Sequence, residues 1–75
     1  MNLTQQPARQ AVGALALAFC GKRLPLQVLR SAAGYYIGTF DDDGPCSRES
    51  EEYWSLRAQA EQALATEQWT QKVTP

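Results

Sequence analysis

Hydrophobic and polar positions along the chain predict a helix, then three strands, then a second helix. The first apolar run covers residues 11–20. Four of its apolar residues share one helical face with Ala8, which precedes the run. The five residues on this face are Ala8, Ala11, Val12, Leu15 and Phe19. Thr4 can cap such a helix, Pro7 suits its first turn, and Gly21 suits a left-handed end. We therefore expect an N-terminal helix, and an apolar run of this length is too short to span a membrane.

The middle of the chain has the pattern of strands separated by turns. Residues 26–32 alternate at first between apolar and polar side chains, residues 35–40 are rich in aromatic and branched side chains, and residues 46–53 are mostly polar. Turn-forming residues lie between these segments, at positions 33–34 and 41–45. This order predicts a three-stranded antiparallel meander in which the third strand is a wet edge.

A second helix is predicted over residues 56–66, with Ser55 as its N-cap. Its apolar stripe is narrow and consists of four residues: Leu56, Ala60, Ala63 and Leu64. We expect both helices to pack on one face of the sheet, which gives an α+β fold with two layers. Residues 1–75 then form a single small domain, with frayed ends at residues 1–5 and 71–75.

Composition narrows the classes of function. The chain has 75 residues, a formal net charge of −1 and no histidine. Histidine is the commonest general acid or base and the commonest metal ligand, and a domain of this size seldom encloses a deep pocket. We therefore expect no enzymatic activity and no cofactor. The aspartates at positions 41–43 are read as turn formers, because the regular ligand spacing of a calcium loop is missing, so no metal site is expected.

Aromatic and arginine side chains on the predicted sheet suggest a surface that binds another protein. Tyr36 and Phe40 share one face of the second predicted strand, and Arg48 and Tyr53 lie in the third. These residue types dominate the energetics of protein interfaces. Together with Leu29, this face is too apolar to be left in water, so a protein partner or a second copy of the chain is expected to cover it.

Nucleic-acid binding is the alternative hypothesis. Tyr35 on a sheet face could stack on a base, while basic side chains could contact phosphates. The candidate basic residues are Arg30, Arg48, Lys22 and Arg23. A balanced net charge gives no electrostatic reason to favour this hypothesis over protein binding.

Two further groups of residues have more than one interpretation. In residues 47–50, the two serines and Arg48 could hold a phosphate or carboxylate. Alternatively, Arg48 could pair with a nearby acid while Ser50 caps a turn, and we favour this second interpretation.

Cys20 and Cys46 show no metal-binding spacing. Two reduced thiols, with Cys20 mostly buried, are the favoured interpretation, and a disulfide or a reactive thiol is the alternative.

Residues 34–54, GYYIGTFDDDGPCSRESEEYW, precede an alanine-rich helix segment and Trp69-Thr70-Gln71. This arrangement resembles a group of short, mostly uncharacterised proteins of bacterial phages, plasmids and integrated elements. The similarity covers residues 26–72, and one departure is Glu67, where a glycine is common, so a left-handed helix cap is not favoured there. The resemblance implies a bacterial cytoplasmic accessory protein that acts on a host protein, including components of host defence. It supplies no reaction, ligand or catalytic residue.

Overall fold

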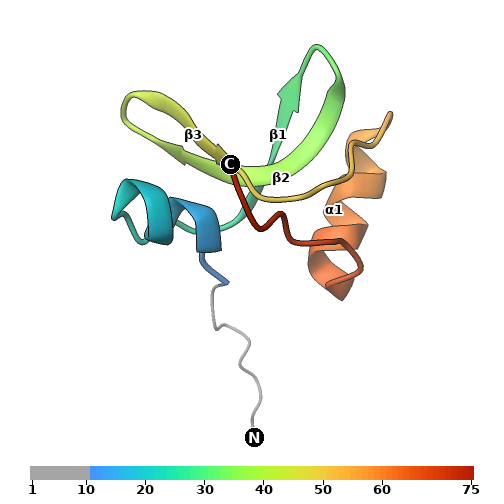
Figure 1. Cartoon of the computed structure of the whole chain (residues 1–75). Coiled ribbons are helices and arrows are strands. Elements are labelled where there is room, and N and C mark those ends of the chain that lie inside the picture. The colour runs from blue at the N-terminus through green and yellow to red at the C-terminus, as the bar shows by residue number, and fades with distance from the viewer. Residues whose placement is uncertain (1–10) are drawn as a thin grey trace, which may run out of the picture.

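The computed structural model describes residues 11–75, which form a small α+β fold (Figure 1). In chain order, the elements are η2 (Ala16–Cys20), β1 (Gln27–Ser31), β2 (Gly34–Asp41), β3 (Gly44–Arg48) and α1 (Arg57–Thr66). The three strands form one sheet in the order β1-β2-β3, and both pairings are antiparallel. The predicted meander is therefore confirmed, with both reversals where the turn-forming residues lie.

Glycine makes both reversals of the meander possible. Gly34 follows the turn between β1 and β2 with φ of 133°, and Gly44 follows the next turn with φ of 111°. Side chains other than glycine are strained at these angles. Strand β2 is strongly bent, so that the two hairpins diverge from one another (Figure 1).

The third strand is shorter than predicted because a β-bulge interrupts it. The N–H groups of Glu49 and Ser50 both donate to the carbonyl of Ile37, at 2.8 and 3.0 Å. Two consecutive residues therefore face one residue of β2, which breaks the alternation of side chains. The chain rejoins the edge of β2 only at Trp54, which exchanges two backbone hydrogen bonds with Tyr35. The bulge buries both Glu49 and Ser50, whereas simple alternation would bury only one of them.

The predicted N-terminal helix is wrong over residues 11–13. Val12 forms an isolated antiparallel bridge with Pro25, and the N–H of Gly13 donates to the carbonyl of Leu24 at 2.9 Å. Helical structure begins at Ala14 and includes the π-helical turn η2, which ends as predicted in the left-handed Gly21, with φ of 68°. The tertiary hydrogen bonds of Ala11 and Gly13, which flank Val12, outweigh the helical spacing of this segment. The earlier part of that prediction, with Thr4, Pro7 and Ala8, lies outside the described residues.

The C-terminal helix is confirmed, with two differences at its ends. It starts at Arg57, so Leu56 takes the cap position, and the side chain of Gln59 accepts the Leu56 N–H at 3.2 Å. It ends at Thr66, and the cap residue Glu67 adopts φ of 59° despite having a side chain. The left-handed cap that the sequence did not favour is therefore present. Leu56 is exposed, and the buried stripe consists of alanines.

The core lies between the sheet and the two helical elements, which the cartoon shows on the same side of the sheet (Figure 1). Val28 of β1 and Ile37 of β2 are paired in register and both are buried. Ala60 and Ala63 of α1 are buried as well, and α1 packs against β1 and β2. Small side chains allow this close approach. Within residues 11–75, no helix has the length and apolar character needed to cross a membrane.

The C-terminal segment forms part of the fold. The N–H of Glu51 donates to the carbonyl of Thr70 at 2.9 Å, and the N–H of Lys72 donates to the carbonyl of Glu49 at 2.7 Å. Gln71, between them, bridges to the bulge after β3. The predicted fraying of residues 71–75 is therefore wrong for Gln71 and Lys72.

Candidate functional site

A buried carboxylate connects four segments of the chain. Glu49 has no exposed surface, and its carboxylate accepts the backbone N–H groups of Leu15 and Ala16, at 2.9 and 3.0 Å. Gln71 donates its side-chain amide to the same carboxylate at 2.8 Å, and the hydroxyl of Ser47 donates at 2.6 Å. Glu49 thus supplies the acceptors that the first N–H groups of the short helix otherwise lack.

The hydrogen bonds to Glu49 determine its charge. Burial by itself raises the pKa of a carboxyl group, but the donors from Leu15, Ser47, Gln71 and Ala16 outweigh it and hold the pKa of Glu49 below its ordinary value. The carboxylate is therefore ionised at neutral pH. Its role is structural, because each of its two oxygens accepts two hydrogen bonds from the chain itself.

The two serines of residues 47–50 are committed to the fold. Ser47 hydrogen-bonds to Glu49 and to the hydroxyl of Thr39, the latter at 2.6 Å. Ser50 accepts the N–H of Ile37 at 3.0 Å and donates to the carbonyl of Glu52 at 2.9 Å. The structure therefore favours the interpretation in which Ser50 satisfies backbone groups, and not a phosphate site.

Arg48 stacks on an aromatic ring and forms no ion pair among the described residues. Its guanidinium carbon lies 4.5 Å from the centre of the Tyr53 ring, and Nη1 donates weakly to the carbonyl of Glu51 at 3.5 Å. The expectation that Arg48 pairs with an acid is wrong. A cation over an aromatic face is attracted by the ring quadrupole, and this contact fixes an otherwise flexible side chain.

Three of the four predicted partner-binding residues lie together, but not all of them are accessible. The rings of Tyr36 and Tyr53 meet edge to face, with centres 5.9 Å apart and an angle of 74°. Tyr53 is 42% exposed, whereas Tyr36 is 7% exposed, and burial raises the pKa of Tyr36. Tyr36 folds over Gly38, where an added Cβ would lie 2.8 Å from its ring. The expectation that Tyr36 is displayed for binding is therefore wrong: it supports Tyr53 from beneath.

The fourth predicted residue, Phe40, lies elsewhere. It is 47% exposed and lines a cleft of about 530 Å³ with Lys22, Leu24 and residues 41–43. Lys22 forms an ion pair with Asp41, which also accepts the N–H of Asp43 at 2.9 Å. Phe40 therefore belongs to the aspartate-rich turn and not to the surface around Arg48.

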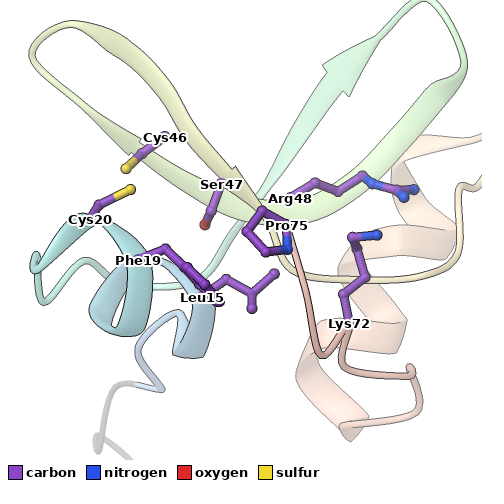
Figure 2. A pocket seen from close by; sticks show the side chains of 8 residues that line it. All are labelled: Leu15, Phe19, Cys20, Cys46, Ser47, Arg48, Lys72 and Pro75. Atoms are coloured by element: carbon purple, nitrogen blue, oxygen red, sulfur yellow. The ribbon is translucent and has the colours of Figure 1, made fainter.

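A second cleft adjoins Arg48 on the side of η2 and has a volume of about 340 Å³. Its walls come from η2, β3 and the C-terminal segment: Leu15, Phe19, Cys20, Cys46, Ser47, Arg48, Lys72 and Pro75. Figure 2 shows the two thiols at one end and the side chains of Arg48 and Lys72 extending away from them. Sequence reasoning did not find Phe19 and Lys72 as neighbours of Arg48, because only the completed fold brings these distant segments together.

The predicted nucleic-acid residues are not gathered on one surface. Arg30 lies 5.6 Å from the centre of the Tyr35 ring, and Arg57 of α1 lies 6.0 Å from it. Tyr35 and Tyr36 are neighbours in β2 and point to opposite faces, so this cluster is separated from Arg48 by the sheet. Of the remaining two residues, Lys22 is ion-paired and Arg23 is exposed.

Among residues 11–75, no three or more histidine, cysteine or acidic side chains are close enough together to hold a metal ion. Comparisons with protein-family models, with curated proteins and with solved structures find no match to this chain.

Proposed function

We propose that this protein is a non-enzymatic protein-interaction module whose contact surface is centred on Tyr53 and Arg48. The observation that carries this proposal is the stacking of the Arg48 guanidinium, 4.5 Å from the centre of a tyrosine ring that remains 42% exposed. Tyrosine and arginine are the residue types that contribute most to binding at protein interfaces. Two such side chains held in place before binding lose little conformational freedom when a partner arrives.

The support beneath Tyr53 strengthens the proposal. Tyr36 meets its ring from the sheet, and the backbone of the neighbouring Trp54 is tied to Tyr35 by two hydrogen bonds of 2.8 Å. An exposed ring with a rigid base is better suited to recognition than one on a free loop. The surface is therefore built from the bulge and the bridge that interrupt the third strand.

The cleft beside Arg48 indicates what kind of partner fits. Phe19 supplies exposed apolar surface, and Lys72 supplies a second cation, besides Arg48, to the lining of the cleft. A protein segment that places an acidic side chain beside an apolar one would satisfy both features. We propose such a segment as the ligand, with a second copy of this chain as the competing occupant.

The resemblance to small proteins of bacterial mobile elements supports a setting for this activity. In that setting the chain acts in the bacterial cytoplasm, where it occludes or regulates a host protein, including a component of host defence. A module that binds without chemistry fits this role, because blocking a surface needs only affinity.

Affinity capture from a bacterial lysate, read by mass spectrometry, tests the proposal. The baits are the wild type, Tyr53→Ala, Arg48→Ala and a matched control, Arg30→Ala, which removes the guanidinium stacked on Tyr35 on the other face. We expect the wild type and Arg30→Ala to enrich the same protein, and both other variants to lose it. Equal enrichment by Arg48→Ala and the wild type would contradict the assigned surface. Circular dichroism of each bait confirms that the fold is retained.

Nucleic-acid binding is a second candidate function, supported by the two arginines near Tyr35. A ring flanked by Arg30 and Arg57 offers a stacking platform with positive charge beside it. Titration with single-stranded and duplex DNA at low salt tests this candidate. If this function is correct, DNA binding weakens steeply as the salt concentration rises. Arg30→Ala should then reduce the affinity for DNA, and Arg48→Ala should leave it unchanged. No binding at low salt would eliminate it.

A further inference from the structure

A second bulge, which lies within β3 and is separate from the one at Glu49 and Ser50, gives Cys46 an unusual position. The pairs on either side of it are Thr39 with Ser47 and Phe40 with Pro45, so Cys46 is an extra residue without a partner on β2. A bulged residue leaves the regular alternation and turns its side chain in a new direction. Here the new direction is toward η2, across the cleft that both elements line.

Cys20 lies on the opposite wall of this cleft and faces Cys46. Cys20 is the last residue of η2, which packs against β3, and the left-handed Gly21 follows it. The two sulfur atoms are turned toward one another in Figure 2. Cys20 is exposed, contrary to its expected burial, whereas Cys46 is half-buried. Both cysteines are free thiols in the structure.

The nearness of the two cysteines also affects the acidity of the Cys46 thiol. The Cys20 thiol beside it, together with burial, raises the pKa of the Cys46 thiol above its ordinary value. The charged groups beside it are Asp41, which acts in the same direction, and Lys22, which pairs with Asp41. Cys46 is therefore protonated at neutral pH, and the more accessible Cys20 is the first of the two to react.

We propose that Cys20 and Cys46 are a reversible oxidation site, in which they form an intramolecular disulfide by exchange with a small disulfide such as oxidised glutathione. The Cys20 thiolate attacks one glutathione sulfur, a mixed disulfide forms, and the first glutathione leaves as a thiolate. The Cys46 thiol then loses its proton and attacks the Cys20 sulfur, which forms the internal bond and releases the second glutathione. Two electrons pass from the protein to the oxidant, and both glutathione thiolates take up protons.

The bond would join η2 to β3 across the whole of β1 and β2. A crosslink between segments so far apart in sequence restricts the unfolded chain more than the folded one. It would also fix the wall of the cleft that carries Phe19. The oxidised protein is therefore expected to melt about 10 °C above the reduced one.

The test uses the full chain in glutathione buffers of increasing oxidised fraction. After acid quenching and alkylation of free thiols, intact mass separates the reduced protein, the glutathione adducts and the internal disulfide. We expect the wild type to become a monomer that has lost two hydrogens, resists alkylation and returns to the dithiol with excess reductant. In urea, the unfolded chain should require a ratio of oxidised to reduced glutathione about a hundredfold higher to reach the same extent of oxidation.

Serine variants test the order of attack. Cys46→Ser should stop at a glutathione adduct on Cys20, and Cys20→Ser should form its adduct more slowly. Wild-type protein that accumulates adducts or linked dimers without the internal bond would overturn the proposal, as would equal oxidation of the native and unfolded chains. These outcomes are read from the wild type itself, so they stand even where a variant folds poorly. They need no binding partner, so they are independent of the proposed interaction surface.

Discussion

The N–H of Leu15 donates to the carboxylate of Glu49 at 2.9 Å, across 34 positions of sequence. This one contact ties the start of the short N-terminal helical segment to the bulge that follows β3. It explains why the helical segment starts where it does, because the side chain that satisfies its first N–H groups comes from the sheet. It also makes Glu49 a structural residue, in line with the favoured interpretation of residues 47–50, in which they do not hold an anion.

Replacing Glu49 should therefore weaken the fold. In Glu49→Gln, the amide group presents N–H donors to the backbone and side-chain donors that the carboxylate now accepts. We expect a loss of about 2–3 kcal/mol in the free energy of unfolding, measured by chemical denaturation. The matched control is Glu51→Gln, two residues on and exposed, which should change stability by less than about 0.5 kcal/mol. Equal effects in the two variants would contradict the role of the buried network.

Acid should lower the stability of the protein, because Glu49 becomes protonated. The pKa of Glu49 is depressed in the folded state, so its contribution is fully present above the unfolded pKa of about 4.3 and is lost as the pH falls through the lower folded value. Glu49→Gln lacks this contribution. The difference in unfolding free energy between the wild type and the variant should shrink as the pH is lowered below about 4.3. A difference that stays constant from pH 7 to pH 3 would show that the carboxylate is not the source.

Gly13 should not tolerate a side chain. A Cβ there would lie 2.5 Å from Oε2 of Glu49 and 2.5 Å from Cγ2 of Thr39, so either the backbone or the buried network must move. We expect Gly13→Ala to cost about 2–3 kcal/mol. Gly21→Ala provides a contrast, because open space surrounds Gly21 and only its left-handed backbone is strained, which costs about 1 kcal/mol. Thermal melts of both variants should rank them in this order, and the reverse order would contradict the close contact.

Glu67 is a position where the natural residue is not the most stable one. It adopts φ of 59° at the end of α1, a conformation that glycine accepts without a steric penalty. Glu67→Gly should raise the free energy of unfolding by about 0.5–1 kcal/mol, after the greater flexibility of glycine in the unfolded chain is subtracted. Glu61→Gly, in the middle of the same helix, should lower it by about 1 kcal/mol. Two changes of the same sign would show that the left-handed cap is absent in solution.

Alanine substitutions at Tyr36 and Tyr53 should differ in how much they lower the stability of the fold. Removing the buried ring in Tyr36→Ala should cost about 3 kcal/mol or more, because a cavity forms over Gly38. Removing the half-exposed ring in Tyr53→Ala should cost about 1 kcal/mol. Urea denaturation distinguishes the two. If both variants lost the same stability, Tyr53 would be a core residue and a poor candidate for a contact surface.

The meander could be predicted from sequence because its signals are local. Gly34 and Gly44 sit at the reversals, and the aromatic run between them has the composition of a central strand. The C-terminal helix is likewise encoded by its own residues. In each case, the element depends on neighbours a few positions away.

The features that sequence did not reveal depend on distant contacts. Residues 11–13 have helical spacing, yet they pair with the segment around Pro25. The bulge at Glu49 and Ser50 exists because both N–H groups converge on Ile37, and nothing in the strand pattern marks it. Of the predicted partner-binding residues, Tyr36, Arg48 and Tyr53 lie together, but the bulge and the bridge at Trp54 decide which of them reaches solvent.

The network around Glu49 also has a consequence for how the chain reaches its native state. It needs the helical turn near Leu15, the bulge after β3 and the segment at Gln71 to be in place together. The two hairpins, in contrast, close through short loops and can form early. We therefore expect the contacts of the buried carboxylate to form after the rate-limiting barrier, so that changes to Glu49 mainly speed unfolding and leave the rate of folding nearly unaltered.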